Sequence, residues 1–244
     1  MMSKTLAILG LVSMLCTSAW AGQELDHAET LKKFNKAMAN PSPAARAAAC
    51  ADLARTPFDK AAVALGNVLN SEADTVRMAA AEGLGAFKDF KKIATPLLLA
   101  ALNSNAKEPK VLEAIFKGLG KLDDDAALST IHNYFDDKDA MVAKASILSA
   151  GEIASPSSMD PLIALMKKYE KIDEQTKKGG GGGAYGGVNV PYAGDDPKGK
   201  LAKDVLPTII KSLQMIANEK WATPKEWEIW WGKNKATFKG AKKS

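Results

Sequence analysis

The residues best suited to contacting a ligand lie near the C-terminus, where tryptophans occur at helical spacing. Trp227, Trp230 and Trp231 stand at i, i+3 and i+4, which places most of their ring surface on one side of a helix. Indole rings can anchor protein interfaces or stack on sugar rings. The stripe is either an exposed aromatic platform or a buried cap on a helical array, and exposure of the rings distinguishes the two.

Nucleophilic and metal chemistry are not indicated. Cys50 lies in the alanine-rich stretch 44–54, which predicts a small buried thiol. The two histidines, His27 and His132, belong to no recognisable nucleophile motif, and they are too few and too distant to complete a zinc site. We therefore expect no enzymatic activity, no cofactor and no metal.

Two acidic clusters invite comparison with calcium loops. They occupy residues 123–125 and residues 136, 137 and 139, all aspartates, between helical patterns. Neither has the alternating ligands, central glycine and distal glutamate of a helix-loop-helix calcium site. Aspartate is also a favoured helix cap. We predict capping, with weak calcium binding as the alternative.

A glycine-rich segment spans residues 179–200 and contains Tyr185 and Tyr192. Its composition predicts a mobile loop. Its letters match two nucleotide-binding motifs, but we reject both. No strand precedes the first motif, and Leu201 stands where the second motif needs Ser or Thr. The loop is either an inert insertion or a lid whose two tyrosines fold over a bound polymer or peptide.

The elements that would position these residues come from a sequence pattern that recurs every thirty-odd residues. The pattern occupies residues 76–85, 111–120 and 142–151, and more loosely 45–54. In the clearest copy Val76, Ala80, Leu84 and Phe87 fall on one helical face. Such a period predicts an all-α solenoid, in which stacked helix pairs bury a continuous core.

Glycines and prolines refine this prediction. Gly83 and Gly118 sit inside helical patterns, so we interpret them as positions where neighbouring helices approach closely. Thr95-Pro96 and Asp160-Pro161 match a capping residue followed by a first-turn proline. A further helix is predicted over 203–217, but the sequence does not decide whether it is the first or the second helix of its repeat. Another helix is predicted to begin at Thr223, because Thr223 and Glu226 have the residue types and spacing of a capping box.

The predicted first helices share Val-Arg/Lys, Ala and Gly-Leu-Gly positions, and one second helix starts with Ile93-Ala-Thr-Pro-Leu-Leu98. In these features the chain resembles HEAT repeats. The resemblance covers roughly residues 40–170 and resumes near 203. It is greatest to the short bacterial repeats named for phycobilisome lyases, and the Trp-rich end resembles that of some secreted bacterial HEAT-repeat proteins. It implies a right-handed α-solenoid of about five repeats. The resemblance is to the repeat and not to any bilin-handling residues, so we expect no lyase activity.

The N-terminus predicts the compartment. Lys4 precedes an apolar run over 6–15, and Ala19-Trp20-Ala21 matches a small-x-small cleavage pattern, so residues 1–21 have the features of a secretory signal peptide. The run is shorter than the roughly 20 residues of a membrane span. We expect a periplasmic or secreted protein with no membrane span.

The predicted organisation is a signal peptide (1–21), HEAT-like repeats (22–178), a glycine-rich loop (179–200), a last repeat with a Trp-rich capping helix (201–238) and a basic tail (239–244). The functional hypothesis is a non-catalytic scaffold whose repeated helices form an extended face that binds other proteins in the cell envelope, with no nucleic-acid partner. The alternative is an envelope polysaccharide-binding protein that uses the tryptophan helix and the C-terminal lysines.

Overall fold

The computed structural model describes residues 24–70, 72–179 and 197–240, and in these residues the regular structure is helical throughout. The helices form five pairs, preceded by a helix over residues 24–38. The first helices of the pairs are α2 (Pro43–Leu53), α4 (Asp74–Leu84), α6 (Pro109–Leu122), α8 (Ala140–Ile153) and α10 (Pro197–Ala217). The second helices are α3 (Asp59–Val68), α5 (Lys91–Ser104), α7 (Leu128–His132), α9 (Met159–Gly179) and α11 (Pro224–Asn234). Short 3-10 turns, η1 (Lys88–Phe90), η2 (Asp125–Ala127) and η3 (Pro156–Ser158), lead into α5, α7 and α9.

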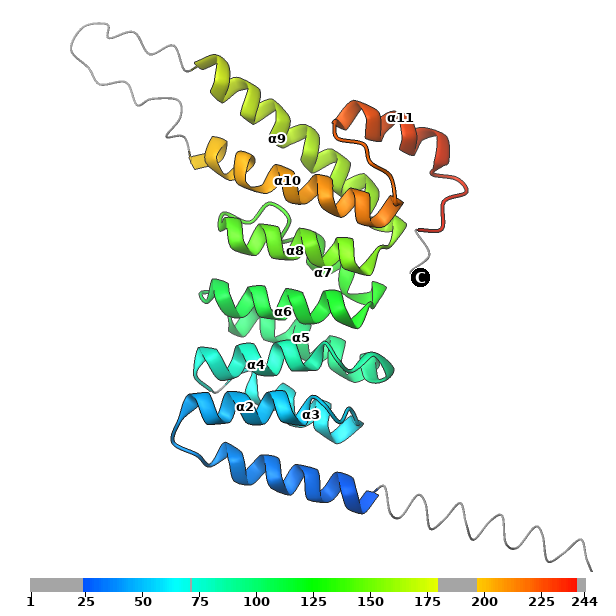
Figure 1. Ribbon diagram of the computed structural model, residues 1–244. Coiled ribbons are helices and arrows are strands. Elements are labelled where there is room, and N and C mark those ends of the chain that lie inside the picture. The colour runs from blue at the N-terminus through cyan, green and yellow to red at the C-terminus, as the bar shows by residue number, and fades with distance from the viewer. Residues whose placement is uncertain (1–23, 71, 180–196, 241–244) are drawn as a thin grey trace, which may run out of the picture.

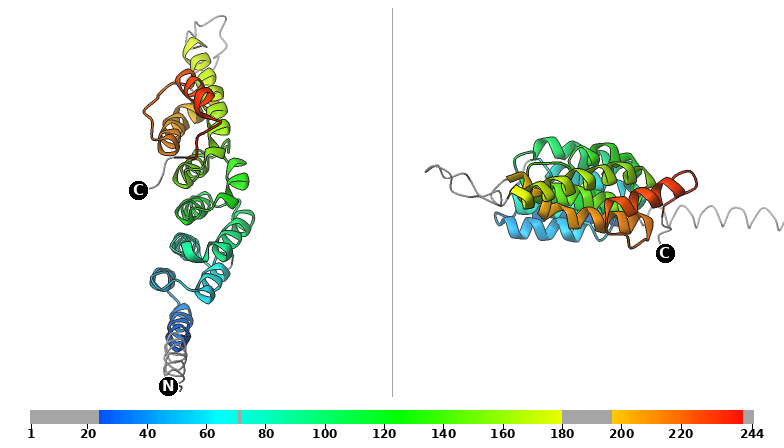
Figure 2. Two further views of the ribbon diagram at one scale, coloured as in Figure 1. Left: turned by 90° about the vertical axis from the view of Figure 1, so that its right-hand side faces the viewer. Right: turned by 90° about the horizontal axis from the view of Figure 1, so that it is seen from above.

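The pairs stack into two layers, as an α-solenoid does. Consecutive first helices contact one another from α2 through α4, α6 and α8 to α10, and each second helix up to α9 lies against the next first helix (Figure 1). The stack is bowed, with the layer of first helices on the inner side of the bend (Figure 2). The predicted all-α solenoid is confirmed. Among the described residues no helix has the length and apolar character to cross a membrane.

The place of the last pair, which the sequence left open, follows from these contacts. Helix α10 packs on α8 as α8 packs on α6, so α10 is a first helix. Helix α11 packs against α9, the preceding second helix. At the other end of the stack, the helix over 24–38 buries Phe34 in the core, and His27 stacks on Phe58 with ring centroids 4.0 Å apart. Both ends of the array are therefore covered by additional helical structure.

The repeated apolar positions form the core. Val76, Ala80, Leu84 and Phe87 are all fully buried, as the periodicity predicted. The equivalent face of α6 is also buried, including Val111, Ile115 and Leu119. Burial of each such branched side chain contributes about 1.5–3 kcal/mol, which makes this core the main source of stability.

Small residues set the spacing between first helices. A β-carbon added at Gly85 would lie 3.1 Å from the Cα atom of Gly118, and one added at Gly151 would lie 2.9 Å from that of Ser212. Gly118 is tighter still, because its added β-carbon would approach the Ala81 carbonyl oxygen to 2.5 Å. The packing role predicted for Gly118 is confirmed. The backbones of neighbouring helices approach so closely that a side chain cannot fit between them.

The series of small residues ends at α10. In α6 and α8 one small residue faces the preceding first helix, and a glycine two positions later faces the next one. These pairs are Gly118 and Gly120 in α6, and Ser149 and Gly151 in α8. In α10 the corresponding positions hold Ser212 and Gln214. The Gln214 amide nitrogen donates a hydrogen bond to the Trp221 carbonyl oxygen at 3.2 Å. A bulky, engaged side chain thus occupies the position through which another first helix would approach α10.

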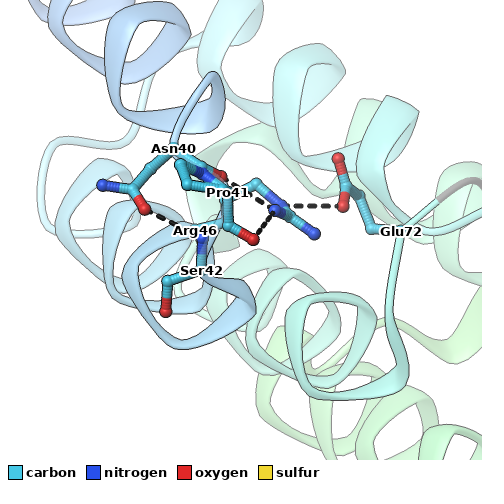
Figure 3. A network of polar contacts seen from close by, with 5 residues as sticks. All are labelled: Asn40, Pro41, Ser42, Arg46 and Glu72. Atoms are coloured by element: carbon cyan, nitrogen blue, oxygen red, sulfur yellow. Dashed lines mark hydrogen bonds and ion pairs between the residues drawn. The ribbon is translucent and has the colours of Figure 1, made fainter.

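Arginines tie the first repeats together at the ends of their helices. The Arg46 guanidinium donates to the carbonyl oxygens of Asn40 and Pro41 at 2.8 and 3.1 Å and to the Glu72 carboxylate at 2.9 Å (Figure 3). Arg77 stands at the corresponding position of α4 and donates to the Asn105 side chain at 2.6 Å. Each arginine reaches the loop before the next first helix, so these contacts are structural.

The prediction that a helix opens at Pro96 is wrong. Pro96 lies inside α5, which already begins at Lys91 after the η1 turn. A proline there lacks the N–H that would bond to the preceding turn. Thr95 is buried and donates its hydroxyl to Asp124 at 2.8 Å instead of capping α5. Pro161, by contrast, lies in the first turn of α9, as expected, although α9 begins at Met159, so Asp160 lies inside the helix and is not the cap that was predicted.

The boundaries of the glycine-rich segment also differ from the prediction. Helix α9 continues to Gly179, and α10 begins at Pro197, six residues before the predicted start at Lys203. Residues 197–200 are therefore helical and not part of a loop. Proline fits the first position of a helix, where its missing N–H would have no partner. Gly199 is buried in this first turn.

Candidate functional site

The C-terminal helix α11 is held by the predicted capping box. The Thr223 hydroxyl accepts a hydrogen bond from the Glu226 amide at 3.3 Å, and the Glu226 carboxylate accepts from the Thr223 amide at 2.9 Å. Contacts from Thr223 and from the Ala222 amide lower the pKa of the exposed Glu226 carboxyl. Two amides that would otherwise lack partners are satisfied, which fixes the start and direction of the helix.

Two of the three tryptophans point into the protein. Trp227 is fully buried and Trp231 is 7% exposed. The Trp231 indole donates to Asp160 at 2.8 Å, and Lys235 forms an ion pair with the same carboxylate at 2.8 Å. The Lys235 hydrogen bond is the largest cause of the lowered pKa of Asp160. Asp160 belongs to the first turn of α9, so the indole joins α11 to the preceding second helix.

Trp230 occupies an intermediate position. It is half-buried, its indole donates to Glu219 at 3.2 Å, and its ring packs on Trp231 at 6.2 Å with 19° between the planes. Phe238 packs edge-on against both rings. The structure thus brings the three tryptophans together as the packed contact of a terminal cap. A platform for sugar rings needs exposed coplanar indoles, and the burial of Trp227 and Trp231 removes two of the three.

The other two residues proposed for ligand contact, Tyr185 and Tyr192, lie outside the described residues. The lid hypothesis therefore stays a prediction.

The acidic clusters cap and connect helices. Asp139 accepts from the Met141 amide at 2.8 Å at the start of α8, and Asp124 accepts from the Ala126 amide at 3.2 Å at the start of η2. Capping is confirmed for these two. Asp136 has a further role, because it accepts the Tyr169 hydroxyl at 2.8 Å and pairs with Lys168. Burial would raise the pKa of Asp136, but the hydrogen bonds from α9 outweigh it and lower the pKa.

Among the described residues, the contacts of Cys50 and the two histidines are those of packed side chains and not of a catalytic pair. Cys50 is fully buried, and burial, with a smaller contribution from Glu72, raises its pKa to about 11. A thiol with so high a pKa is not a nucleophile at neutral pH. The His132 ring contacts the buried Ser158 hydroxyl at 2.9 Å. In the described part of the chain no group of three His, Cys, Asp or Glu residues is arranged to hold a metal ion.

The extended binding face expected of the repeated helices follows the first helices, but the sequence singled out none of its residues. Helices α4, α6 and α8 are covered on two sides by neighbouring first helices and behind by second helices, so their remaining exposed stripes face the inner side of the bend (Figure 2). We call this surface the inner face and define it by Met78, Glu82, Lys110, Lys117, Met141 and Lys144. It combines two methionines with one glutamate and three lysines. The sequence signal was available, since these residues fill the gaps between the repeated core positions.

The inner face is partly ordered by its own ion pair. Lys117 of α6 contacts Glu82 of α4 at 3.1 Å, and this hydrogen bond is the main cause of the raised pKa of Lys117. In contrast, Lys110 and Lys144 are exposed and form no ion pair within the described residues. Met141, which stands three residues before Lys144 on α8, is 38% exposed. The face therefore offers unpaired charge next to accessible apolar surface.

Comparison with known protein families matches the model of HEAT repeats to residues 31–108 and 95–174, which together exceed half of the chain. The chain belongs to the HEAT-repeat family. HEAT repeats form helical scaffolds that commonly mediate protein interactions. The matched residues run from the helix over 24–38 into α9, so α10 and α11 extend the HEAT array beyond the matched part. A search among curated proteins found no match.

Proposed function

We propose that this protein is an exported, non-catalytic HEAT-repeat scaffold that binds other proteins in the cell envelope through its inner face. The observation that carries the proposal is the continuous two-layer stack, which aligns exposed stripes of successive first helices on one bowed surface. Solenoids use such extended concave surfaces to bind their partners.

The composition of the inner face supports a protein partner. Met78 and Met141 give adaptable apolar contacts, while Lys110 and Lys144 give charged contacts around them. Interfaces that form and dissociate typically combine apolar centres with polar surroundings. A polysaccharide partner has less support, because two of the three indoles expected to bind it are buried.

Export rests on the sequence of residues 1–21. The basic start, the short apolar run and the Ala19-Trp20-Ala21 pattern are typical of a cleaved signal peptide, with cleavage near Ala21. Fractionation of cells followed by N-terminal sequencing tests this part directly. A protein that stays in the cytoplasm with residues 1–21 attached would refute export.

The scaffold itself is tested by affinity capture. The chain lacking residues 1–21 is immobilised and exposed to a cell-envelope extract at physiological salt, and the retained material is identified by mass spectrometry and sugar analysis. We expect a small, reproducible set of proteins. The double variant Met141→Glu/Lys144→Glu should release them, because it reverses one charge and places another on the apolar centre of the inner face.

A matched control is available on the second layer. Val63, 45% exposed, and Lys60 stand three residues apart on α3, just as Met141 and Lys144 do on α8. The variant Val63→Glu/Lys60→Glu should retain the same proteins as the unmodified chain. Loss of binding in both variants, or retention of glycan alone, would contradict the inner-face scaffold.

A further inference from the structure

The positive charge of this protein is concentrated at one end. Residues 197–244 contain eleven lysines and four carboxylates, a net charge of +7, whereas the whole chain carries +5. The rest of the chain is therefore slightly acidic. The described part of this end, residues 197–240, comprises α10, α11 and the residues up to 240 at the C-terminal end of the stack (Figure 1), and its nine lysines and four carboxylates give a net charge of +5.

Helix α11 presents a basic and apolar face to solvent. Lys225, Ile229 and Lys233 are spaced by four residues, which places them in line on the side opposite the buried Trp227 and Trp231. Ile229 is 52% exposed, although it is a large apolar residue. Nothing lies within 4 Å of a β-carbon added at Gly232, so the surface around it is open.

The carboxylates of this helix are engaged and its two lysines are not. Glu226 is bound in the capping box, and Glu228 pairs with Lys167 of α9. Lys225 and Lys233 form no ion pair with any described residue. The face therefore has an uncompensated positive charge on both sides of an exposed apolar side chain.

We propose that this face of α11 is a peripheral contact for an anionic membrane surface. Lysines near such a surface are attracted to lipid headgroups, while an apolar side chain between them inserts at the boundary. Trp221, which is 37% exposed, precedes the helix and adds a residue type favoured at that boundary. Helix α11 lies on the outside of the stack against α9 (Figure 1). The contact would hold the scaffold at a membrane and goes beyond the proposed protein binding.

The test is co-sedimentation of the chain lacking residues 1–21 with vesicles made of equal parts phosphatidylglycerol and phosphatidylethanolamine. We expect binding to these vesicles, weaker binding at high salt and none to phosphatidylcholine vesicles. The variant Lys225→Glu/Lys233→Glu should weaken the apparent partition coefficient about tenfold or more, because two attractive charges become repulsive. Ile229→Ser should weaken it about threefold or more, because an inserted apolar side chain is lost.

A matched control changes the same charge elsewhere. Lys32 and Lys36 are exposed and four residues apart on the helix over 24–38, so Lys32→Glu/Lys36→Glu alters net charge equally and should leave vesicle binding within about twofold of the unmodified chain. Equal loss in both double variants would overturn the proposal, as would failure to sediment with anionic vesicles. If vesicles are not bound but Lys225→Glu/Lys233→Glu loses a protein captured from the extract, the face binds an acidic protein and the membrane contact is wrong. The inner-face variant Met141→Glu/Lys144→Glu leaves α11 unchanged, so loss of captured proteins in that variant reports on the scaffold and not on the α11 face.

Discussion

Replacement of Gly118 by alanine tests whether close helix contacts fix the spacing of the stack. A glycine in the middle of a helix is ordinarily unfavourable, and alanine there would stabilise the protein by about 1 kcal/mol. Gly118 lies in the middle of α6, where the added methyl group would stand 2.5 Å from the Ala81 carbonyl oxygen and 3.1 Å from a Leu98 methyl group. The helix propensity of alanine therefore predicts a more stable protein, whereas the packing around Gly118 predicts a less stable one.

The packing should prevail at this position. The nearest atom belongs to the α4 backbone and cannot rotate away, so α4 and α6 must separate. Overpacking of this kind costs about 1–3 kcal/mol. Because a 2.5 Å approach lies far inside van der Waals contact, we expect the upper part of that range. After subtraction of the intrinsic gain from alanine, Gly118→Ala should lower the free energy of unfolding by about 1–2 kcal/mol.

The assay is urea denaturation followed by circular dichroism, with Gly232→Ala as the matched control. Gly232 is also helical, but a β-carbon there meets nothing within 4 Å. Alanine at this position should raise the free energy of unfolding by a few tenths of a kcal/mol up to about 1 kcal/mol. If Gly118→Ala is as stable as the unmodified chain or more so, the inference that backbone contact sets the helix spacing is refuted.

Three further predictions concern single side chains. Trp227→Ala should lower the free energy of unfolding by about 3–5 kcal/mol, measured by urea denaturation, because a fully buried ring leaves a cavity; a loss below 1 kcal/mol would mean that α11 does not cap the stack. The pKa of His132 is lowered by burial, so its neutral form stabilises the fold above about pH 6.5, and this contribution should disappear as the pH falls through that value towards the lower folded pKa. Denaturation midpoints measured across this range should fall less steeply in His132→Gln, and an unchanged slope would contradict the assignment. Cys50, with its pKa raised to about 11, should resist alkylation at pH 8 and react at an ordinary thiol rate in urea, whereas fast labelling of the folded protein would show that it is accessible.

The architecture could be predicted because the same physical requirement recurs along the chain. Each first helix must bury one face, so Val76 and Val111 occupy equivalent places, and repetition separates this signal from chance. The prediction of a helix start at Pro96 failed because Thr followed by Pro is a common helix start, whereas burial of Ala94 and Leu98 on either side keeps α5 helical through the proline. Tertiary packing outweighs the local preference there.

The environment of the tryptophans could not be predicted from their spacing. An amphipathic aromatic stripe has the same sequence whether it faces solvent or another helix. The deciding contact joins Trp231 to Asp160, residues 71 positions apart in the chain. The individual residues of the inner face were not singled out because lysines, methionines and a glutamate between core positions are ordinary helix-surface residues, and it is the stacking of the first helices that aligns them on one surface.

Gln214 has a consequence for how this array can change in length during evolution. A duplicated helix pair appended after α11 would meet a bulky side chain on α10 where α4, α6 and α8 present glycine, as well as α11 itself. A pair inserted between α6 and α8 would find Gly120 on one side and a small residue, Ser149, on the other. Repeats can therefore be gained or lost in the interior of the array, while its C-terminal end is inherited as a fixed unit.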